Sequence, residues 1–185
     1  KQPQGDARSP GLLLSAQQQM RAQQKKSDMK ILYICTHNRC RSILSEAITN
    51  HLGQGRIQAY SAGSQPSGEV HPLSIRYLQE RGIETAGLQS QSWDAFESEQ
   101  PDVVVTVCDS AASETCPVWF GDTVKVHWGL PDPSKLEVSE EEIRQAFFSV
   151  MDTIERRVRG LLSVDFDNLP REALQVELAK IAEVN

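Results

Sequence analysis

Residues 31–47 read Ile31-Leu-Tyr-Ile-Cys35-Thr-His-Asn-Arg-Cys40-Arg41-Ser42-Ile-Leu-Ser-Glu46-Ala. Residues 31–34 are a short apolar run rich in β-formers, which is typical of a buried parallel strand. Residues 42–52 carry apolar side chains at helical spacing. The stretch therefore predicts a strand, a tight loop and the start of a helix in direct succession.

The loop in this stretch carries the pattern Cys-x5-Arg-Ser at Cys35, Arg41 and Ser42. A loop that ends a strand and opens a helix points its N–H groups inward, and the helix dipole adds positive potential there. The guanidinium of Arg41 can grip two oxygens at once. We expect the same field to lower the pKa of Cys35 and to keep it as a nucleophilic thiolate.

The pattern therefore predicts a site for a tetrahedral oxyanion. The alternative is two buried cysteines and a surface arginine, but the strand and helix around the loop favour the oxyanion site. The remaining members of the predicted oxyanion-binding loop are Thr36, His37, Asn38, Arg39 and Cys40.

Composition narrows the class of protein. The chain has 185 residues, of which 39% are hydrophobic and 24% charged, as in ordinary globular proteins. The net charge of -6 argues against general nucleic-acid binding. No apolar run approaches the roughly 18 residues of a membrane span. The 4 cysteines are too few for a disulfide scaffold and lack zinc spacing, so we expect reactive thiols in a reducing, cytoplasmic setting.

The rest of the chain alternates strands and helices, which predicts an α/β fold with an open four-stranded parallel sheet and helices on both faces. Residues 61–63 are expected as a turn and residues 109–115 as a flexible polar segment. The further strands are predicted at residues 56–61, 102–107 and 123–128, and the helices at residues 72–81, 93–97, 139–163 and 170–183.

Three parts of the chain differ in character. The Gln-rich residues 1–28 are expected to form a disordered or loosely helical extension. Residues 29–163 form the predicted domain with the oxyanion site. Residues 164–185 are expected to supply a C-terminal helix that packs on this domain or trails it.

Two further residues follow strand ends and should lie near Cys35, because ligand sites of such sheets lie beyond the carboxyl ends of the strands. Cys108 follows one strand. Asp132 lies in a loop where Pro131 and Pro133 fix the backbone on either side. An aspartate above an anion site can act as general acid to a leaving oxygen. The alternatives are a turn aspartate and a buried core cysteine.

Cys35-x5-Arg41-Ser42, with Leu130-Pro-Asp132-Pro133 roughly ninety residues later, resembles the low-molecular-weight protein tyrosine phosphatases over about residues 29–162. Within that superfamily the chain is similar to the thioredoxin-coupled arsenate reductases. The deciding features are Cys108 at a strand end and Cys116-Pro117 after a polar segment. Phosphatases of this fold do not need these two cysteines, and they usually carry aromatic residues where this chain has residues 134–136. The alternative interpretation of Cys116, taken without Cys108, is an incidental surface thiol.

The resemblance implies a thiol relay that reduces arsenate, with phosphate and sulfate as competing anions. Cys35 attacks arsenic while Asp132 protonates the departing oxygen. Cys108 then attacks Cys35, and arsenite leaves. Cys116 attacks Cys108, and thioredoxin reduces the resulting Cys108–Cys116 disulfide. Cys116 favours thioredoxin over glutaredoxin or a small thiol as the reductant.

The resemblance also suggests roles for other residues. It implies a potassium ion at Asn38, Glu46 and Ser61, with no tightly bound cofactor otherwise. Ser42 is expected to donate a hydrogen bond to the Cys35 thiolate, to cap the helix, or both. Asn38 is expected in a left-handed conformation. Cys40 is expected to be packed, although oxidation could join it to Cys35.

Two loop positions depart from the family pattern. His37 stands where the family often has glycine, and Arg39 stands where it often has a small residue; both should add positive character to the loop rim.

Two competing functions remain. A phosphatase of the same fold would need Cys35, Arg41 and Asp132 but neither of the other two relay cysteines. A non-catalytic redox sensor would have no need of a complete set of nucleophile, arginine and acid. We expect an arsenate-reducing monomer that binds neither nucleic acid nor membrane.

Overall fold

The computed structural model describes residues 29–183 as one α/β unit around a four-stranded parallel sheet. The strands lie in the order β2-β1-β3-β4, and all three neighbouring pairs are parallel. This confirms the predicted sheet. The strands are β1 (Met29–Cys35), β2 (Ile57–Gly63), β3 (Val103–Thr106) and β4 (Val124–His127).

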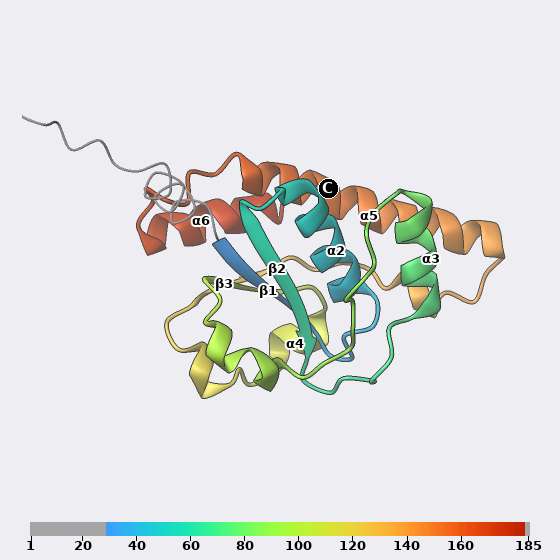
Figure 1. Cartoon of the computed structure of the whole chain (residues 1–185), viewed down its shortest axis with the longest axis horizontal. Helices are drawn as coiled ribbons and strands as arrows, with labels where there is room; N and C mark the ends of the chain where they lie inside the picture. Colours follow the sequence, from blue (N-terminus) through green and yellow to red (C-terminus); the bar gives the residue numbers. More distant parts are fainter. Residues whose placement is uncertain (1–28, 184–185) are drawn as a thin grey trace, which may run out of the picture.

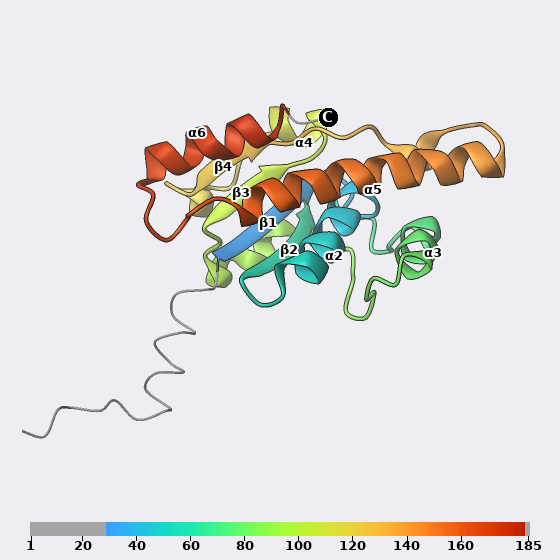
Figure 2. The same cartoon turned by 90° about the horizontal axis from the view of Figure 1, so that it is seen from above.

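Helices cover both faces of the sheet (Figures 1 and 2). One face carries α2 (Arg41–Gly53), α5 (Glu140–Leu162) and α6 (Arg171–Ile181), and α3 (Pro72–Glu80) packs against α2 and α5. The other face carries the short helices η1 (Trp93–Glu99), α4 (Asp109–Ser113) and η2 (Val118–Phe120). The remaining helix, η3 (Pro133–Lys135), lies in the loop after β4.

Local sequence signals explain where the helices begin. The hydroxyl of Ser139 accepts a hydrogen bond from the Glu142 backbone N–H at 3.2 Å, and three glutamates in the first turn of α5 complement the helix dipole. His71 caps α3, and Pro72 occupies its first turn. The predicted starts of these two helices are therefore confirmed.

The centre of the core is β1, as the apolar run predicts. Residues 31–34 are each at most 1% exposed, because helices cover both of their faces. The edge strand β4 is covered by α6. The indole N–H of Trp128, directly after β4, donates to the Leu178 carbonyl oxygen of α6 at 2.9 Å. The C-terminal helix thus contacts the segment that leads from β4 into the Asp132 loop.

Two sequence predictions about local structure are wrong. Residues 61–63 are not a turn, because β2 continues to Gly63, which pairs with Cys35 of β1. Residues 109–115 are not irregular throughout, because residues 109–113 form α4. The sulfur of Cys108 caps this helix by accepting the Ala111 backbone N–H at 3.4 Å.

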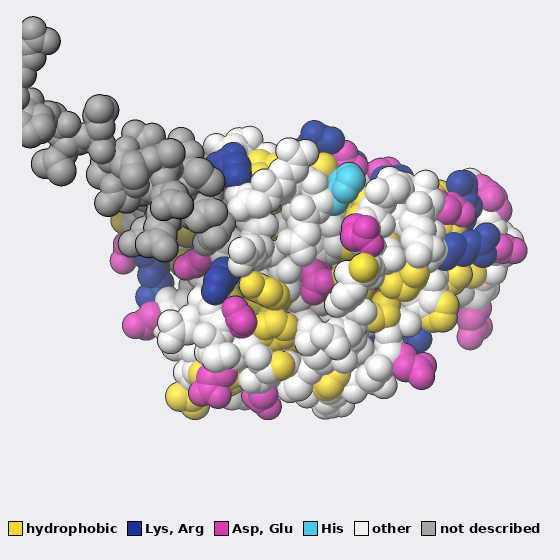
Figure 3. Space-filling view, in the orientation of Figure 1, with side chains coloured by type: hydrophobic (Ala, Val, Ile, Leu, Met, Phe, Trp, Pro, Cys, Tyr) yellow, Lys and Arg dark blue, Asp and Glu magenta, His cyan; other side chains and the backbone are white. Residues whose placement is uncertain are grey.

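Surface features agree with the composition. On the face of the described residues shown in Figure 3, acidic and basic side chains are interspersed and form no continuous basic stripe. Within residues 29–183 no helix combines the length and the apolar character needed to cross a bilayer.

Candidate active site

The loop between β1 and α2 turns its carbonyl groups away from its centre. The carbonyl oxygen of Thr36 accepts the Gln65 backbone N–H at 2.9 Å, and that of His37 accepts from Ser67 N–H at 3.0 Å. The carbonyl oxygen of Arg39 accepts from the segment that opens α3, at 2.9 Å. Since these carbonyls are directed at neighbouring segments, we infer that the loop N–H groups face its interior, at the start of α2. This is the backbone arrangement of an oxyanion cradle.

Asn38 holds the loop in shape from behind. Its φ of 48° lies in the left-handed region, as predicted, and its side chain is fully buried. The amide donates to the Ser42 hydroxyl at 2.8 Å and accepts from the Gln91 backbone N–H at 2.9 Å.

Ser42 does not cap α2, because Cys40 occupies the N-cap position. Among the described residues its hydroxyl is hydrogen-bonded to Asn38, and no hydrogen bond to Cys35 forms. Ser42 therefore supports the loop through Asn38.

Gly63 allows the close approach of β2 to this loop. A Cβ atom at position 63 would lie 2.5 Å from the Thr36 carbonyl oxygen and 3.1 Å from the Asn38 Cβ atom. Both neighbours are fixed parts of the loop, so the loop would have to move.

We expect Gly63→Ala to destabilise the protein by roughly 2 kcal/mol, as overpacking of a tight site does, and to weaken anion binding. Thermal unfolding and phosphate titration would measure both effects. Gly160→Ala is the matched control, because a Cβ atom there would meet Ile181 at an ordinary 3.5 Å. Equal stability of the two variants would contradict this role of Gly63.

Cys35 and Cys108 lie together at the carboxyl end of the sheet and share a hydrogen bond. The hydrogen bond from Cys35 is the main reason that the pKa of Cys108 is lowered to about 5, although burial opposes it. The same hydrogen bond, together with burial, raises the pKa of Cys35, whereas Arg41 lowers it. The pair therefore loses its first proton readily and its second with difficulty.

This differs from the sequence-based expectation that the loop field alone would lower the pKa of Cys35. In the resting structure Cys108 is the more acidic of the two thiols, and Cys35 holds its proton more tightly.

A second set of contacts ties the segment after Cys108 to the loop. The hydroxyl of Thr36 lies 3.7 Å from the Cys108 sulfur and donates to a Glu114 carboxylate oxygen at 3.3 Å. His127 Nε2 lies 3.1 Å from an Asp109 carboxylate oxygen at the start of α4. The contacts explain why this short segment is helical in the structure.

Cys116 lies apart from this pair. It is exposed, whereas the other three cysteines are buried, and all four are free thiols. Val118, two residues later, is 97% exposed. The structure therefore places one thiol within reach of a large partner and two thiols beside the loop.

Arg41 and Asp132 face each other across the mouth of the loop. Arg41 Nη2 lies 3.5 Å from an Asp132 carboxylate oxygen, and Arg41 Nη1 donates to the Leu130 carbonyl oxygen at 3.2 Å. The other carboxylate oxygen of Asp132 accepts from the Ser134 backbone N–H at 3.0 Å and from its hydroxyl at 2.6 Å. The loop after β4 is thus held against the oxyanion loop by Arg41.

The oxyanion loop and the loop that carries Asp132 enclose a pocket of about 100 Å³. Ser110 and Lys135 also line the pocket, although the sequence did not predict them as site residues. The signal that could have identified them is their short spacing from Cys108 and Asp132. Cys40 is 3% exposed, and burial raises the pKa of its thiol to about 12, so it is packed and protonated. The residues that line the pocket are Cys35, Thr36, His37, Arg39, Cys40, Arg41, Ser110, Asp132 and Lys135.

Only two of the three residues expected to hold potassium are in direct contact. The hydroxyl of Ser61 donates to a Glu46 carboxylate oxygen at 3.0 Å. Burial raises the pKa of Glu46 to about 7, and in the described part of the chain no basic side chain pairs with it. The Asn38 amide is instead bonded to Ser42 and Gln91.

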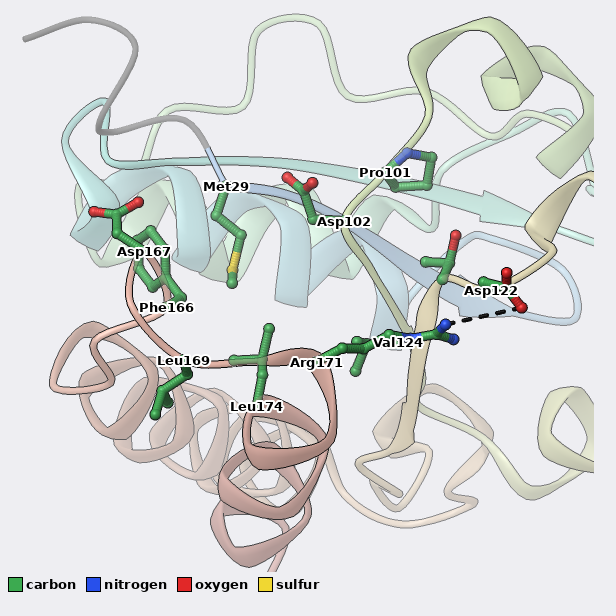
Figure 4. Close-up of a pocket in the computed structure, with 11 residues that line it drawn as sticks. Met29, Pro101, Asp102, Asp122, Val124, Phe166, Asp167, Leu169, Arg171 and Leu174 are labelled. Atoms are coloured by element: carbon green, nitrogen blue, oxygen red, sulfur yellow. Dashed lines mark ion pairs between the residues drawn. The ribbon is translucent and has the colours of Figure 1, made fainter. Parts of the chain in front are cut away.

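A larger cavity, of about 500 Å³, lies at the opposite edge of the sheet, beside the amino ends of β1 and β4 (Figure 4). Apolar side chains such as Phe166 and Leu174 line it, together with an ion pair between Asp122 and Arg171 at 3.8 Å. No cysteine lines it, so its chemistry differs from that of the oxyanion loop.

Comparison with known proteins agrees with this geometry. Residues 30–177 match the model of the family described as low molecular weight phosphotyrosine protein phosphatase. An arsenate reductase from Halalkalibacterium halodurans is 34% identical over 129 residues, which cover 70% of this chain and 91% of the relative. A glutaredoxin arsenate reductase from a Synechocystis species is 29% identical over 134 residues, covering 72% of this chain and 96% of the relative.

A solved structure described as an arsenate reductase in the phosphate binding state superposes with a TM-score of 0.57 at 29% identity. The match covers 71% of this chain and 97% of that one. Sequence and fold therefore point to the same group of proteins. The chain belongs to the low molecular weight phosphotyrosine protein phosphatase family and is related to the arsenate reductases of that family.

Proposed function

We propose that this protein reduces arsenate to arsenite through a thiol relay of Cys35, Cys108 and Cys116. The observation that carries the proposal is the hydrogen-bonded Cys35–Cys108 pair beside the oxyanion loop. A phosphatase would need one nucleophilic sulfur at this loop, and the second sulfur adds redox capacity. The arsenate reductases among the relatives support the same conclusion.

The first step is attack of the Cys35 thiolate on arsenic. Arsenate lies in the loop, bound by its N–H groups and by Arg41, and one arsenate oxygen leaves as water after Asp132 protonates it. The proton that Cys35 loses passes to Cys108, which therefore enters the next step as a thiol. The product is a covalent adduct between the Cys35 sulfur and arsenic.

In the second step Cys108 attacks the Cys35 sulfur and passes its proton to an oxygen of the departing arsenite. A Cys35–Cys108 disulfide forms, the sulfur–arsenic bond breaks, and its electron pair stays on arsenic, which leaves as arsenite. Two electrons have then moved from two thiols to arsenic. Cys116 attacks Cys108 next, frees Cys35 as a thiolate, and leaves a Cys108–Cys116 disulfide.

The last exchange requires α4 to open, because Cys108 is buried and Cys116 is exposed. Disulfide formation removes the negative charge from the Cys108 sulfur that caps α4, so oxidation weakens the helix. We propose thioredoxin as the reductant of the exposed disulfide. The free thiols of this cycle require a reducing compartment, so we place the protein in the cytoplasm, as a monomer.

The test is NADPH oxidation with arsenate and two complete reducing systems. One contains thioredoxin and thioredoxin reductase; the other contains glutaredoxin, glutathione and glutathione reductase. We expect arsenate-dependent turnover with the first. Turnover with the second alone would transfer the reductant role to glutaredoxin. Hydrolysis of p-nitrophenyl phosphate without NADPH oxidation in either system would establish a phosphatase instead.

We further propose that a potassium ion binds at Glu46. A buried carboxylate without a basic partner fits a monovalent cation, and Glu46 and Ser61 would hold it. Asn38 fits less well, because its amide oxygen already accepts a hydrogen bond. The ion would supply positive charge behind the loop.

The raised pKa of Glu46 predicts a pH-dependent stability. Between about pH 4.5, its ordinary pKa, and about pH 7, the folded protein keeps a proton that the unfolded chain has released. Stability should therefore fall as the pH rises through this window, by about 3 kcal/mol, and level off above it. Denaturant unfolding in tetramethylammonium buffers would measure the fall.

Glu46→Gln should abolish this fall, because the amide does not titrate. Potassium should stabilise the wild type at pH 8 and leave the variant unchanged. Identical pH profiles for wild type and variant would refute the assignment to Glu46, and an effect of potassium on both proteins would place the ion elsewhere.

A further inference from the structure

Two basic side chains at the rim of the anion pocket have no acidic partner. Arg39 and Lys135 both line the pocket. Within residues 29–183 neither side chain forms an ion pair or a hydrogen bond, whereas Arg41 is paired with Asp132 at 3.5 Å. The rim charges are therefore free to act on whatever enters the pocket.

The charged side chains in the inner part of the pocket carry no net positive charge to offset a dianion. The positive charge of Arg41 is paired with the carboxylate of Asp132 at 3.5 Å, and the acidic Cys108 thiol lies beside Cys35 at the same end of the sheet. A doubly charged oxyanion that enters such a site is repelled unless further positive charge lies nearby. Arg39 and Lys135 supply that charge and reverse the sign of the site.

The backbone fixes Lys135 relative to the acid. Lys135 ends η3, and Asp132 caps the same short helix by accepting the Ser134 N–H at 3.0 Å. The ammonium group thus belongs to the side of the pocket where the departing oxygen meets Asp132. A fourth oxygen at this position gains a charged hydrogen-bond donor, whereas an aryl group there would desolvate the ammonium.

We propose that Lys135, assisted by Arg39, is a specificity-determining residue that selects inorganic tetrahedral oxyanions over aryl esters. The inference deepens the proposed function, since it concerns the substrate class of the same pocket. Binding of inorganic phosphate tests it without any turnover, so it can fail or succeed independently of the relay.

The experiment measures phosphate affinity by calorimetry for wild type, Lys135→Met, Lys135→Arg and Lys180→Met. Lys180 is the matched control because it lies on α6 and does not line this pocket. We expect Lys135→Met to weaken phosphate binding about tenfold and Lys135→Arg about twofold or less, with Lys180→Met unchanged. Added salt should weaken wild-type binding more steeply than binding by Lys135→Met.

The second readout is selectivity. The KM for p-nitrophenyl phosphate should change less in Lys135→Met than the dissociation constant for phosphate, so the preference for the inorganic anion falls. Unchanged phosphate affinity in Lys135→Met, or an equal loss for phosphate and the aryl ester, would overturn the inference. If wild type binds phosphate and Lys135→Met does not, but arsenate causes no NADPH oxidation, the inference stands and the relay fails.

Discussion

Replacing Cys108 by serine is expected to lower arsenate-dependent NADPH oxidation by about 10³-fold or more, because the hydroxyl cannot form the disulfide that releases arsenite. The structure gives this variant a second effect. Cys108 is the main cause of the raised pKa of Cys35, so its removal should lower that pKa and favour the Cys35 thiolate, although burial still opposes it.

The variant should still cleave p-nitrophenyl phosphate, because Cys35, Arg41 and Asp132 remain, and its activity should extend to lower pH. Incubation of this variant with arsenate should release no arsenite. Cys116→Ser separates the two steps: it should release one arsenite per protein molecule and then stop with a Cys35–Cys108 disulfide, which mass spectrometry would detect.

Ser113→Ala is the control for damage to α4, because its hydroxyl only donates to the Ser110 carbonyl oxygen within the same helix. It should turn over like the wild type. Full activity of Cys108→Ser with thioredoxin would remove Cys108 from the reaction and leave Cys35 and Cys116, or an external thiol, as the reducing pair.

The meeting of Cys35, Cys108 and Asp132 could be predicted because parallel strands end at one edge of a sheet. Each residue follows a strand whose apolar run is visible in the sequence, and the structure brings all three to that edge. The left-handed conformation of Asn38 was predictable for a similar reason, since it is a property of one residue type at one position.

The distribution of charge over the sulfurs could not be predicted. It depends on a hydrogen bond between Cys35 and Cys108, which are far apart in the sequence. The helix α4 was missed because its cap is a cysteine sulfur and not one of the usual capping residues. The role of Lys135 was not predicted because its lack of an acidic partner depends on which side chains surround it in the folded protein. The hydrogen bond between the thiols and the surroundings of Lys135 involve elements that the sequence does not show as neighbours, whereas the cap of α4 is local but uses an unusual residue type.

The second large effect concerns Arg41, whose guanidinium has two tasks. Its two Nη atoms hold the loop that carries Asp132, which we call the acid loop, through the Leu130 carbonyl oxygen and the Asp132 carboxylate. The Nε atom is buried and has no acceptor within the described part of the chain. A buried N–H without an acceptor is costly, and an oxyanion in the pocket would satisfy it. Arg41 is therefore oriented to bind the anion and the acid loop together.

Arg41→Lys should weaken phosphate binding by roughly 100-fold, although the charge is kept, because an ammonium cannot form two parallel hydrogen bonds to the anion. The loss of the bond to the Leu130 carbonyl oxygen should also loosen the Asp132 loop. We therefore expect kcat for p-nitrophenyl phosphate to fall along with phosphate affinity, whereas a purely electrostatic role would leave both nearly unchanged.

Calorimetry with phosphate and the pH dependence of kcat would measure the two effects. Arg159→Lys is the matched control, because Arg159 pairs only with Glu155 on the exposed side of α5. A loss of less than threefold in phosphate affinity would show that charge alone binds the anion. A loss of affinity with unchanged kcat would confine Arg41 to anion binding, and Asp132 would then be held by Ser134 without its help.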